Sequence, residues 1–193
     1  QFSTSNLTQW QSGGLHPVYV EMRRLISSPV ARKKLAKLLM EEIKESGVKF
    51  DGLAAVDRGG NFVADYLAYQ GNWPMVSVKK EGKDHGVSDQ ISGIFEPGKI
   101  YLGIEDTVST AGSLIERMEI IRERGGIVTH AFCIFDYGLK KSKENLKKAK
   151  IKLISLTDFP TVFKEAINLG DIFDKETEKE VRKWYKTPFS EKN

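Results

Sequence analysis

The stretch from Lys99 to Ser113, KIYLGIEDTVSTAGS, constrains the fold more than any other part of this 193-residue chain. Its short apolar run is typical of a buried parallel strand and ends in two acids, Glu105 and Asp106. Small and hydroxyl residues follow, and they predict a tight turn whose backbone N–H groups point inward at the start of a helix. Such a turn binds phosphate. We expect both acids at the rim of a sheet, with nothing apolar to bury them, where they can accept hydrogen bonds from sugar hydroxyls.

An ordinary strand–turn–helix corner, capped by Ser109 or Thr110, would account for the same residues without a ligand. Short motifs of this kind are hypotheses until their structural context is known. The rest of the chain therefore decides between a phosphate site and a plain corner.

Composition bounds the class of protein. Hydrophobic residues make up 40% and charged residues 29% of the chain, which is usual for a globular protein of one domain. The net charge of +4 suits a small anionic substrate and is too weak to indicate nucleic acid as a partner. The single cysteine, Cys133, excludes an internal disulfide and favours a reducing, cytoplasmic location. No apolar run is long enough to span a membrane, and the start lacks a signal-peptide pattern.

Short apolar runs alternate with helical patterns along most of the chain. After a polar start and a short strand at 18–20, strands are expected at residues 50–56, 75–78, 100–104, 127–135 and 151–156. Helices are expected at residues 29–46, 62–70, 113–124, about 158–169 and 175–185. This alternation predicts an α/β fold with a mainly parallel central sheet and flanking helices.

The helix expected at 113–124 follows the organising stretch directly. Leu114, Met118 and Ile121 recur at helical spacing and should form its buried stripe. Four charged residues should lie largely on its outer side: Glu116, Arg117, Glu119 and Arg122.

A glycine loop follows the strand expected at 50–56. It consists of Asp57, Arg58, Gly59 and Gly60, and a helix is expected from Phe62 onward. Backbone N–H groups at such a strand–helix junction can bind an anion, although a glycine pair there is often only a turn. Because ligands of parallel sheets lie at the carboxyl ends of the strands, this loop and the organising stretch should share one rim.

The stretch Lys79–Gly86, KKEGKDHG, follows another expected strand and opens a long loop through residue 98. Three lysines and a histidine so close together cannot lie in a core, and a solvated loop is the usual interpretation of such a run. Its place directly after a strand, one strand ahead of the acid pair, instead favours a mobile lid that neutralises phosphate as it closes.

These stretches resemble a known family. Residues 99–113 resemble the phosphoribosyl pyrophosphate (PRPP) motif of the type I phosphoribosyltransferases, with Thr107 where an apolar residue is usual and Ala111 where glycine is commonest. The stretch Lys79–Gly86 resembles, almost residue by residue, the catalytic loop of orotate phosphoribosyltransferases. The stretch Ser12–Pro29 resembles their amino-terminal hood.

The resemblance implies one phosphoribosyltransferase domain over residues 1–193, with a hood at 1–28 and carboxyl-terminal helices at 157–193. It implies the transfer of phosphoribose from PRPP to orotate, giving orotidine 5′-phosphate and pyrophosphate in the biosynthesis of pyrimidine nucleotides such as UMP. It also implies magnesium carried by PRPP, with no direct metal ligand from the chain, and a homodimer whose sites are shared across the interface.

The resemblance also assigns roles to residues. The catalytic set is Lys83, His85 and Asp106. The PRPP-binding set is Lys79, Lys80, Lys83, His85, Glu105, Asp106, Thr107, Val108, Ser109, Thr110, Ala111, Gly112 and Ser113. The loop Asp57, Arg58, Gly59 and Gly60 would hold pyrophosphate, and Ser109, Tyr137 and Gln11 would lie at the base.

Two positions at the base depart from the family pattern. Gln11 stands where many members have lysine, and Tyr137 stands where an arginine faces the orotate carboxylate. Both replacements remove a cation from the place where an anionic base should bind. A phosphoribosyltransferase for another nucleobase and a PRPP-sensing regulator without turnover therefore remain as alternatives, although the intact lid sequence favours an enzyme.

Overall fold

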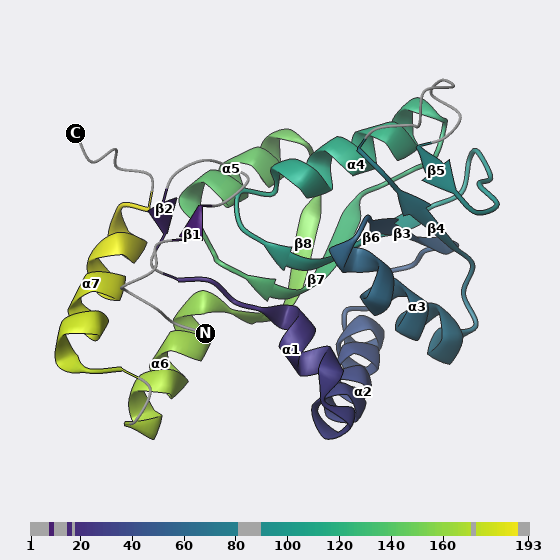
Figure 1. Cartoon of the computed structure of the whole chain (residues 1–193). Helices are drawn as coiled ribbons and strands as arrows, with labels where there is room; N and C mark the ends of the chain where they lie inside the picture. Colours follow the sequence, from purple (N-terminus) through teal and green to yellow (C-terminus); the bar gives the residue numbers. More distant parts are fainter. Residues whose placement is uncertain (1–7, 10–14, 17, 81–89, 171–172, 189–193) are drawn as a thin grey trace.

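The structure, a computed structural model, describes residues 8–9, 15–16, 18–80, 90–170 and 173–188 (Figure 1). In chain order its elements are β1 Thr8–Gln9, β2 Leu15–His16, α1 Met22–Ser27, α2 Pro29–Glu45, β3 Gly52–Val56, α3 Gly59–Gly71, β4 Met75–Val78, β5 Ile91–Ser92, β6 Tyr101–Val108, α4 Gly112–Glu123, β7 His130–Asp136, α5 Lys140–Lys148, β8 Lys152–Asp158, α6 Phe159–Leu169 and α7 Lys175–Lys186.

The main sheet confirms the predicted architecture. Among the described residues it has six strands in the order β5-β4-β3-β6-β7-β8. Every neighbouring pair is parallel except β4 and β5, which run antiparallel. The short strands β1 and β2 pair with each other in a separate antiparallel ribbon. Parallel neighbours require long crossover connections, and here these carry the helices that cover the sheet.

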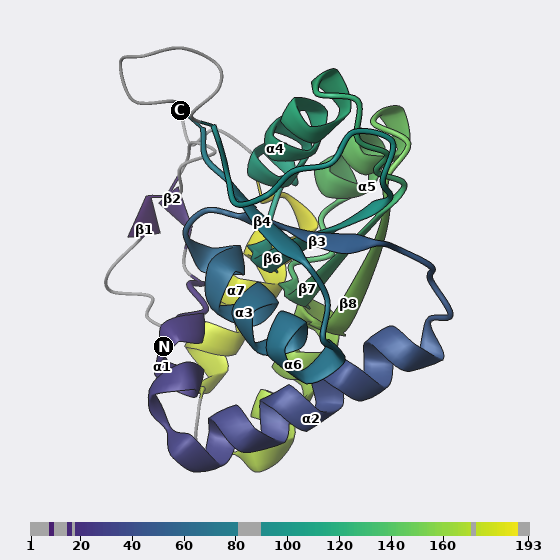
Figure 2. The same cartoon turned by 90° about the vertical axis from the view of Figure 1, so that its right-hand side faces the viewer.

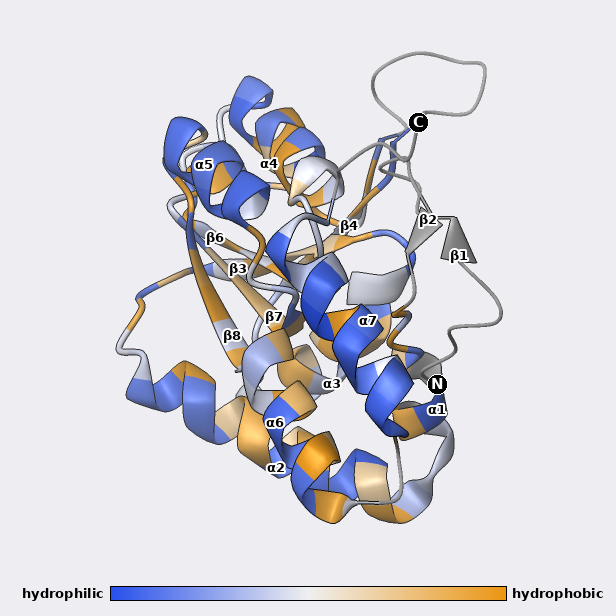
Figure 3. Cartoon of the chain, turned by 90° about the vertical axis from the view of Figure 1, so that its left-hand side faces the viewer, coloured by the Kyte–Doolittle hydropathy of each residue, from blue (hydrophilic) through white to orange (hydrophobic). Residues whose placement is uncertain are grey.

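Helices cover both faces of the sheet (Figures 1 and 2). On one face α2, α3 and α6 enclose a core around Leu53, Ile104 and Phe132. On the other face α4 and α5 enclose a second core around Val76 and Met118. Strand β3 is buried along its whole length, as a central strand between two helical layers should be. Figure 3 shows the same division, with hydrophobic strands inside and hydrophilic outer turns on α5 and α7.

The predicted helices and strands recur with shifted ends. Asp158 accepts the Thr161 N–H and so caps α6, and Cys133 is fully buried in β7 as a small apolar residue. Strand β6 continues past the expected end through Val108. Helix α3 begins at Gly59, so the glycine pair is its first turn and not a loop before it.

Several short elements were not predicted, among them the paired strands β1 and β2. The six-residue helix α1 is too short to show a helical period, and Met22 buries its start in the core that α2 covers. Strand β5 has only two residues and pairs with the end of β4. The strand expected at Val18–Val20 is reduced to a single bridge at Val18. The division into a hood and carboxyl-terminal helices stays a prediction.

Gly60 is the point where α3 approaches the sheet most closely. A Cβ atom there would collide with the backbone carbonyl oxygen of Ile104 in β6, which has no room to move inside a central strand. We therefore expect Gly60→Ala to lower the free energy of unfolding by about 3 kcal/mol in urea titrations. Gly112→Ala is the matched control, because its Cβ would meet nothing closer than Thr110 Oγ1 at 3.7 Å. Equal stability of both variants would contradict this close approach.

Candidate active site

Three connections meet at the carboxyl edge of the sheet. Val56 and Val78 are register partners, so β3 and β4 end level with each other. Strand β6 runs beside β3 and extends beyond it to Val108. The loop after β3, the segment after β4 and the turn after β6 therefore lie along one rim, as the sequence predicts.

Glu105 and Asp106 point to opposite faces of the sheet, because successive residues of a strand alternate. Asp106 is half-buried and lies against the start of α3, where a Cβ on Gly59 would fall on its carboxylate. Glu105 is only 7% exposed, and the positive charge of Arg117 in α4 lowers its pKa. The expectation that nothing buries the acids is thus wrong for Glu105, because β6 continues past it and α4 covers it.

Burial raises the pKa of Glu105 well above its usual value of 4.5, and the neighbouring Asp106 charge raises this pKa further. A hydrogen bond from the Asp106 backbone N–H lowers the pKa, as does the Arg117 guanidinium, but neither cancels the effect of burial. Glu105 consequently resists ionisation more than an exposed glutamate does.

This raised pKa predicts a pH-dependent stability. The folded chain binds the Glu105 proton more tightly than the unfolded chain, so its contribution to stability is present below pH 4.5 and is lost as pH rises through the folded-state pKa. Glu105→Gln cannot ionise, and it should therefore be more stable than the parent chain at pH 7 by about 1 kcal/mol or more. Urea unfolding between pH 4.5 and pH 8 measures this. An advantage that is constant over this range would exclude Glu105 titration as its source.

The turn after β6 leads into α4 through Ala111, whose φ of 63° lies in the left-handed region. Glycine adopts this conformation most easily, which gives a physical reason for its frequency at this position of the resembled motif. No described side chain caps α4, so the corner capped by Ser109 or Thr110 is not formed. Asn145 of α5 donates to the Thr110 carbonyl oxygen at 2.9 Å and fixes the turn from outside. Gly112 and Ser113 are exposed, so the first N–H groups of α4 face solvent and can meet an anion.

The connection after β3 is held by a short polar chain. Asn61 donates to Asp57 Oδ1 at 2.9 Å, and Ser77 of β4 donates to Asn61 Oδ1 at 2.8 Å. Arg58 is exposed and precedes α3, whose first turn also lacks a side-chain cap among the described residues. A second helix N-terminus therefore opens on the same rim, beside Asp106.

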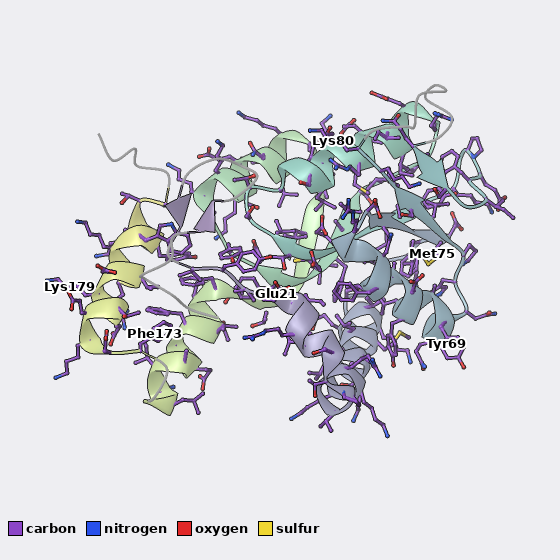
Figure 4. The ribbon with its side chains drawn as sticks, viewed as in Figure 1. Glu21, Tyr69, Met75, Lys80, Phe173 and Lys179 are labelled. Atoms are coloured by element: carbon purple, nitrogen blue, oxygen red, sulfur yellow. The ribbon has the colours of Figure 1, made fainter. Side chains whose placement is uncertain are left out.

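The basic segment after β4 is described only at its two ends. Lys79 donates its backbone N–H to the Gln90 carbonyl oxygen at 2.8 Å, and Gln90 Nε2 donates to the Lys80 carbonyl oxygen at 2.9 Å. Lys80 is exposed just beyond β4, where Figure 4 labels it. Lys83 and His85 lie outside the described residues, and their predicted roles stay predictions.

Tyr137 follows β7 at the same rim and is 3% exposed. Its ring packs against Phe135 and Phe159, and its hydroxyl accepts the Val20 backbone N–H at 3.1 Å. These contacts of Tyr137 join the amino-terminal segment, at Val20, to the sheet. Its role at the base stays a prediction, as do those of half-buried Ser109 and of Gln11, which lies outside the described residues.

Comparison with known proteins decides the family. No family model matches the chain. An orotate phosphoribosyltransferase of Oceanobacillus iheyensis is 34% identical over 176 residues, covering 91% of this chain and 87% of the relative. The chain belongs to the orotate phosphoribosyltransferase family. The member from Porphyromonas gingivalis is 32% identical over 188 residues, covering 95% of this chain and 87% of its own.

Solved structures agree with this membership. The orotate phosphoribosyltransferase of Aeropyrum pernix superposes with a TM-score of 0.73 at 26% identity, covering 85% of this chain and 90% of that one. Leishmania donovani UMP synthase superposes with a TM-score of 0.80 at 21% identity, covering 96% of this chain and 39% of the synthase, and so supports the fold alone. The family makes the chain a pentosyltransferase.

The positions of two residues beside the site were not predicted from the sequence. Asn145 lies in the basic stretch at residues 140–150, which indicates a short helix on a solvated surface, and nothing in the sequence indicates its contact with Thr110. Arg117 was expected on the outer side of its helix and is instead 8% exposed. A signal was available for Arg117, because it directly precedes Met118 of the apolar stripe.

Proposed function

We propose that the carboxyl edge of this sheet transfers the phosphoribosyl group of PRPP to orotate, releasing pyrophosphate and orotidine 5′-phosphate. The observation that carries the proposal is the position of Asp106 between two helix N-termini that no described side chain caps. A ribose with a phosphate on C5 and a pyrophosphate on the anomeric carbon needs this arrangement: two sites for anions with a hydrogen-bond acceptor between them.

Different residues would bind different parts of PRPP. The 5′-phosphate would bind the turn from Thr107 to Ser113 at the start of α4. Pyrophosphate would bind the loop from Asp57 to Gly60, together with Lys79, Lys80, Lys83 and His85. Asp106 would accept hydrogen bonds from the ribose hydroxyls.

In the reaction the bond from the anomeric carbon to pyrophosphate breaks, and pyrophosphate leaves with the electron pair. A ring nitrogen of orotate forms the new bond to that carbon, and the proton of that nitrogen passes to solvent. Positive charge grows on the ribose between these events, so a carboxylate beside the sugar stabilises the transition state more than the ground state. The lid cations stabilise the charge that develops on the leaving group.

Magnesium fits this site as an ion bound to PRPP. Within the described residues no group of three or more histidine, cysteine, aspartate or glutamate side chains is arranged to hold a metal. Mg²⁺ is commonly bound through substrate phosphates, with few protein ligands. We propose that the ion would arrive bound to PRPP and would supply positive charge that stabilises the leaving group.

Orotate is the substrate that the family supports, and its carboxylate needs a cation. With Gln11 and Tyr137 at two family positions, we propose that exposed Arg24 or Arg58 meets this carboxylate. We expect pyrophosphate release from PRPP and magnesium to depend on orotate in a screen of free bases. Calorimetry should also detect orotate in the presence of ribose 5-phosphate and pyrophosphate. Binding of a neutral base with none of orotate would favour a phosphoribosyltransferase for another base, and PRPP binding without turnover on any base would favour a sensor.

Assembly and location complete the proposal. We propose a homodimer in which Lys83 and His85 reach the partner subunit's site, and light scattering should give twice the chain mass. No helix among the described residues is long and apolar enough to cross a membrane. With a single buried cysteine, we place the reaction in the cytoplasm.

A further inference from the structure

The positive charge of this chain is concentrated on one short helix. Residues 140–150, which form α5 and the turn after it, carry six lysines and one glutamate, a net charge of +5. The remaining 182 residues hold 24 lysines and arginines against 25 aspartates and glutamates, a net charge of −1. The exposed lysines of this stretch, called here the lysine face of α5, are Lys140, Lys141, Lys143, Lys147, Lys148 and Lys150.

Helix α5 lies directly beside the turn that we propose for the 5′-phosphate. Asn145 Nδ2 donates to the Thr110 carbonyl oxygen at 2.9 Å, so the helix touches the turn through this side chain. Where β7 leads into α5, the Tyr137 N–H donates to the Val108 carbonyl oxygen at 2.9 Å. The chain therefore enters the helix from the same edge of the sheet at which the turn lies.

The helical period places two lysines on the side of α5 that meets the turn. Lys141 and Lys148 stand four residues before and three residues after Asn145, and residues at these spacings have Cβ atoms about 5–6 Å apart. Ser142 and Leu146 are buried, so the helix is fixed against the sheet by a different side. Because the electrostatic screening length is about 10 Å at 0.1 M salt, both lysine charges act on an anion that approaches the turn.

The turn itself supplies no countercharge to a phosphate. Residues 107–113 include no charged side chain, and the first cation after them, Arg117, is 8% exposed and pairs with Glu116 at 2.6 Å. The strands that end at this edge add the acids Glu105, Asp106 and Asp136, which repel anions. A positive field at the phosphate end of the site must therefore come from outside the turn, and α5 is the basic element that touches it.

We propose that the lysine face of α5 draws PRPP to the site electrostatically, by giving the uncharged phosphate turn a positive field. The inference rests on the proposed function for the identity of the ligand, whereas the attraction itself applies to any sugar phosphate that binds the turn. No contact between a lysine and the ligand is required, because a surface field of one sign raises the local concentration of an anion and its association rate by factors of ten or more.

Lys141→Glu/Lys148→Glu tests the inference by reversing the charge beside the turn. At about 20 mM salt, kcat/KM for PRPP should fall roughly tenfold while kcat stays the same, because the helix acts on the approach of the anion and not on the chemical step. Calorimetry should show a similar loss of affinity for ribose 5-phosphate. Both differences should shrink to less than about twofold at about 0.5 M salt, where the field is screened within a few ångströms.

Lys33→Glu/Lys34→Glu is the matched control, because it makes the same change in net charge on exposed residues of α2. Figure 1 shows α5 above the sheet and α2 below it. The control should change kcat/KM for PRPP by less than about twofold at the same low salt. Equal losses in the two double variants would show that only net charge matters, and would overturn the inference.

A loss that persists at high salt would also overturn the inference, because it would mean that the two lysines touch the ligand or hold the turn in place. Lys141→Gln/Lys148→Gln removes the charges without reversing them and should lower kcat/KM for PRPP roughly threefold at low salt. If Lys141→Glu/Lys148→Glu does not fold, this neutral variant decides by the same criteria.

Ribose 5-phosphate separates this inference from the proposed function, because its binding needs no turnover. Salt-dependent weakening of ribose 5-phosphate by Lys141→Glu/Lys148→Glu, in a chain that transfers nothing to orotate, would support the attraction and overturn the proposed function. Turnover of PRPP and orotate with an unchanged kcat/KM in this variant would overturn the attraction alone. Failure of the parent chain to bind ribose 5-phosphate would overturn both.

Discussion

Lys83→Ala should lower turnover by roughly a hundredfold or more and leave the melting temperature nearly unchanged, because it removes a cation that stabilises the leaving pyrophosphate in the transition state. The residue belongs to the glycine-rich charged run after β4 and is not needed to form the sheet, whose neighbouring strands pair independently of it. Steady-state kinetics with PRPP and orotate, together with thermal unfolding, measure both quantities.

Lys152→Ala removes the same charge from an exposed position at the amino end of β8, away from the proposed site. It should change turnover by less than about twofold, because an exposed cation outside the site contributes little at ordinary ionic strength. Normal turnover of Lys83→Ala with a large loss of stability would instead make the loop after β4 structural.

Asp106→Asn should weaken the binding of PRPP and ribose 5-phosphate by roughly one to two factors of ten, which is the worth of a charged hydrogen bond. The substitution keeps the shape of the side chain against Gly59 and removes its charge. Pyrophosphate lacks the ribose hydroxyls, so its binding should change little. Turnover should fall further than affinity, because positive charge grows on the ribose in the transition state. Calorimetry with the three ligands and steady-state kinetics measure these effects.

Asp51→Asn is the matched control for the carboxylate. Asp51 accepts the Ile100 N–H at 2.8 Å near the amino ends of β3 and β6, at the opposite edge of the same strands. Its amide can still accept that hydrogen bond, so stability should change slightly and all three affinities should stay the same. Equal weakening of all three ligands by Asp106→Asn, or failure of this variant to fold, would show that Asp106 holds the turn together and does not bind the sugar.

Most of the architecture could be predicted because its signals are local. Strand β4, at Met75–Val78, lies where its apolar run predicts it, and α2 begins at Pro29 as its helical period indicates. The antiparallel strand β5 could not be found, because two residues carry no period and their pairing with β4 depends on how the intervening segment returns.

The sequence predicted that the parts of the candidate site share one edge of the sheet, and it predicted their detailed geometry less well. Residue order alone brings Asp106, the turn before α4 and the start of α3 to one edge. The sequence does not show how far β6 continues, and this length decides that Glu105 is buried. The prediction for Arg117 was wrong for a related reason. Its charge favours a solvent-exposed position, whereas its place along α4 turns it toward the sheet. Opposing signals of this kind occur at functional sites, where local preference yields to the requirements of a ligand.

Two hydrogen bonds, from Lys79 to Gln90 and from Gln90 to Lys80, hold together the two ends of the segment that we propose as the lid. Since Lys80 and Gln90 are held together, the segment between them begins and ends at one point, whatever conformation it takes. If this segment acts as the proposed lid, the closure at its two ends would keep the lid cations near the carboxyl edge of the sheet. Inserting residues into the segment should then lower activity gradually without disturbing the sheet.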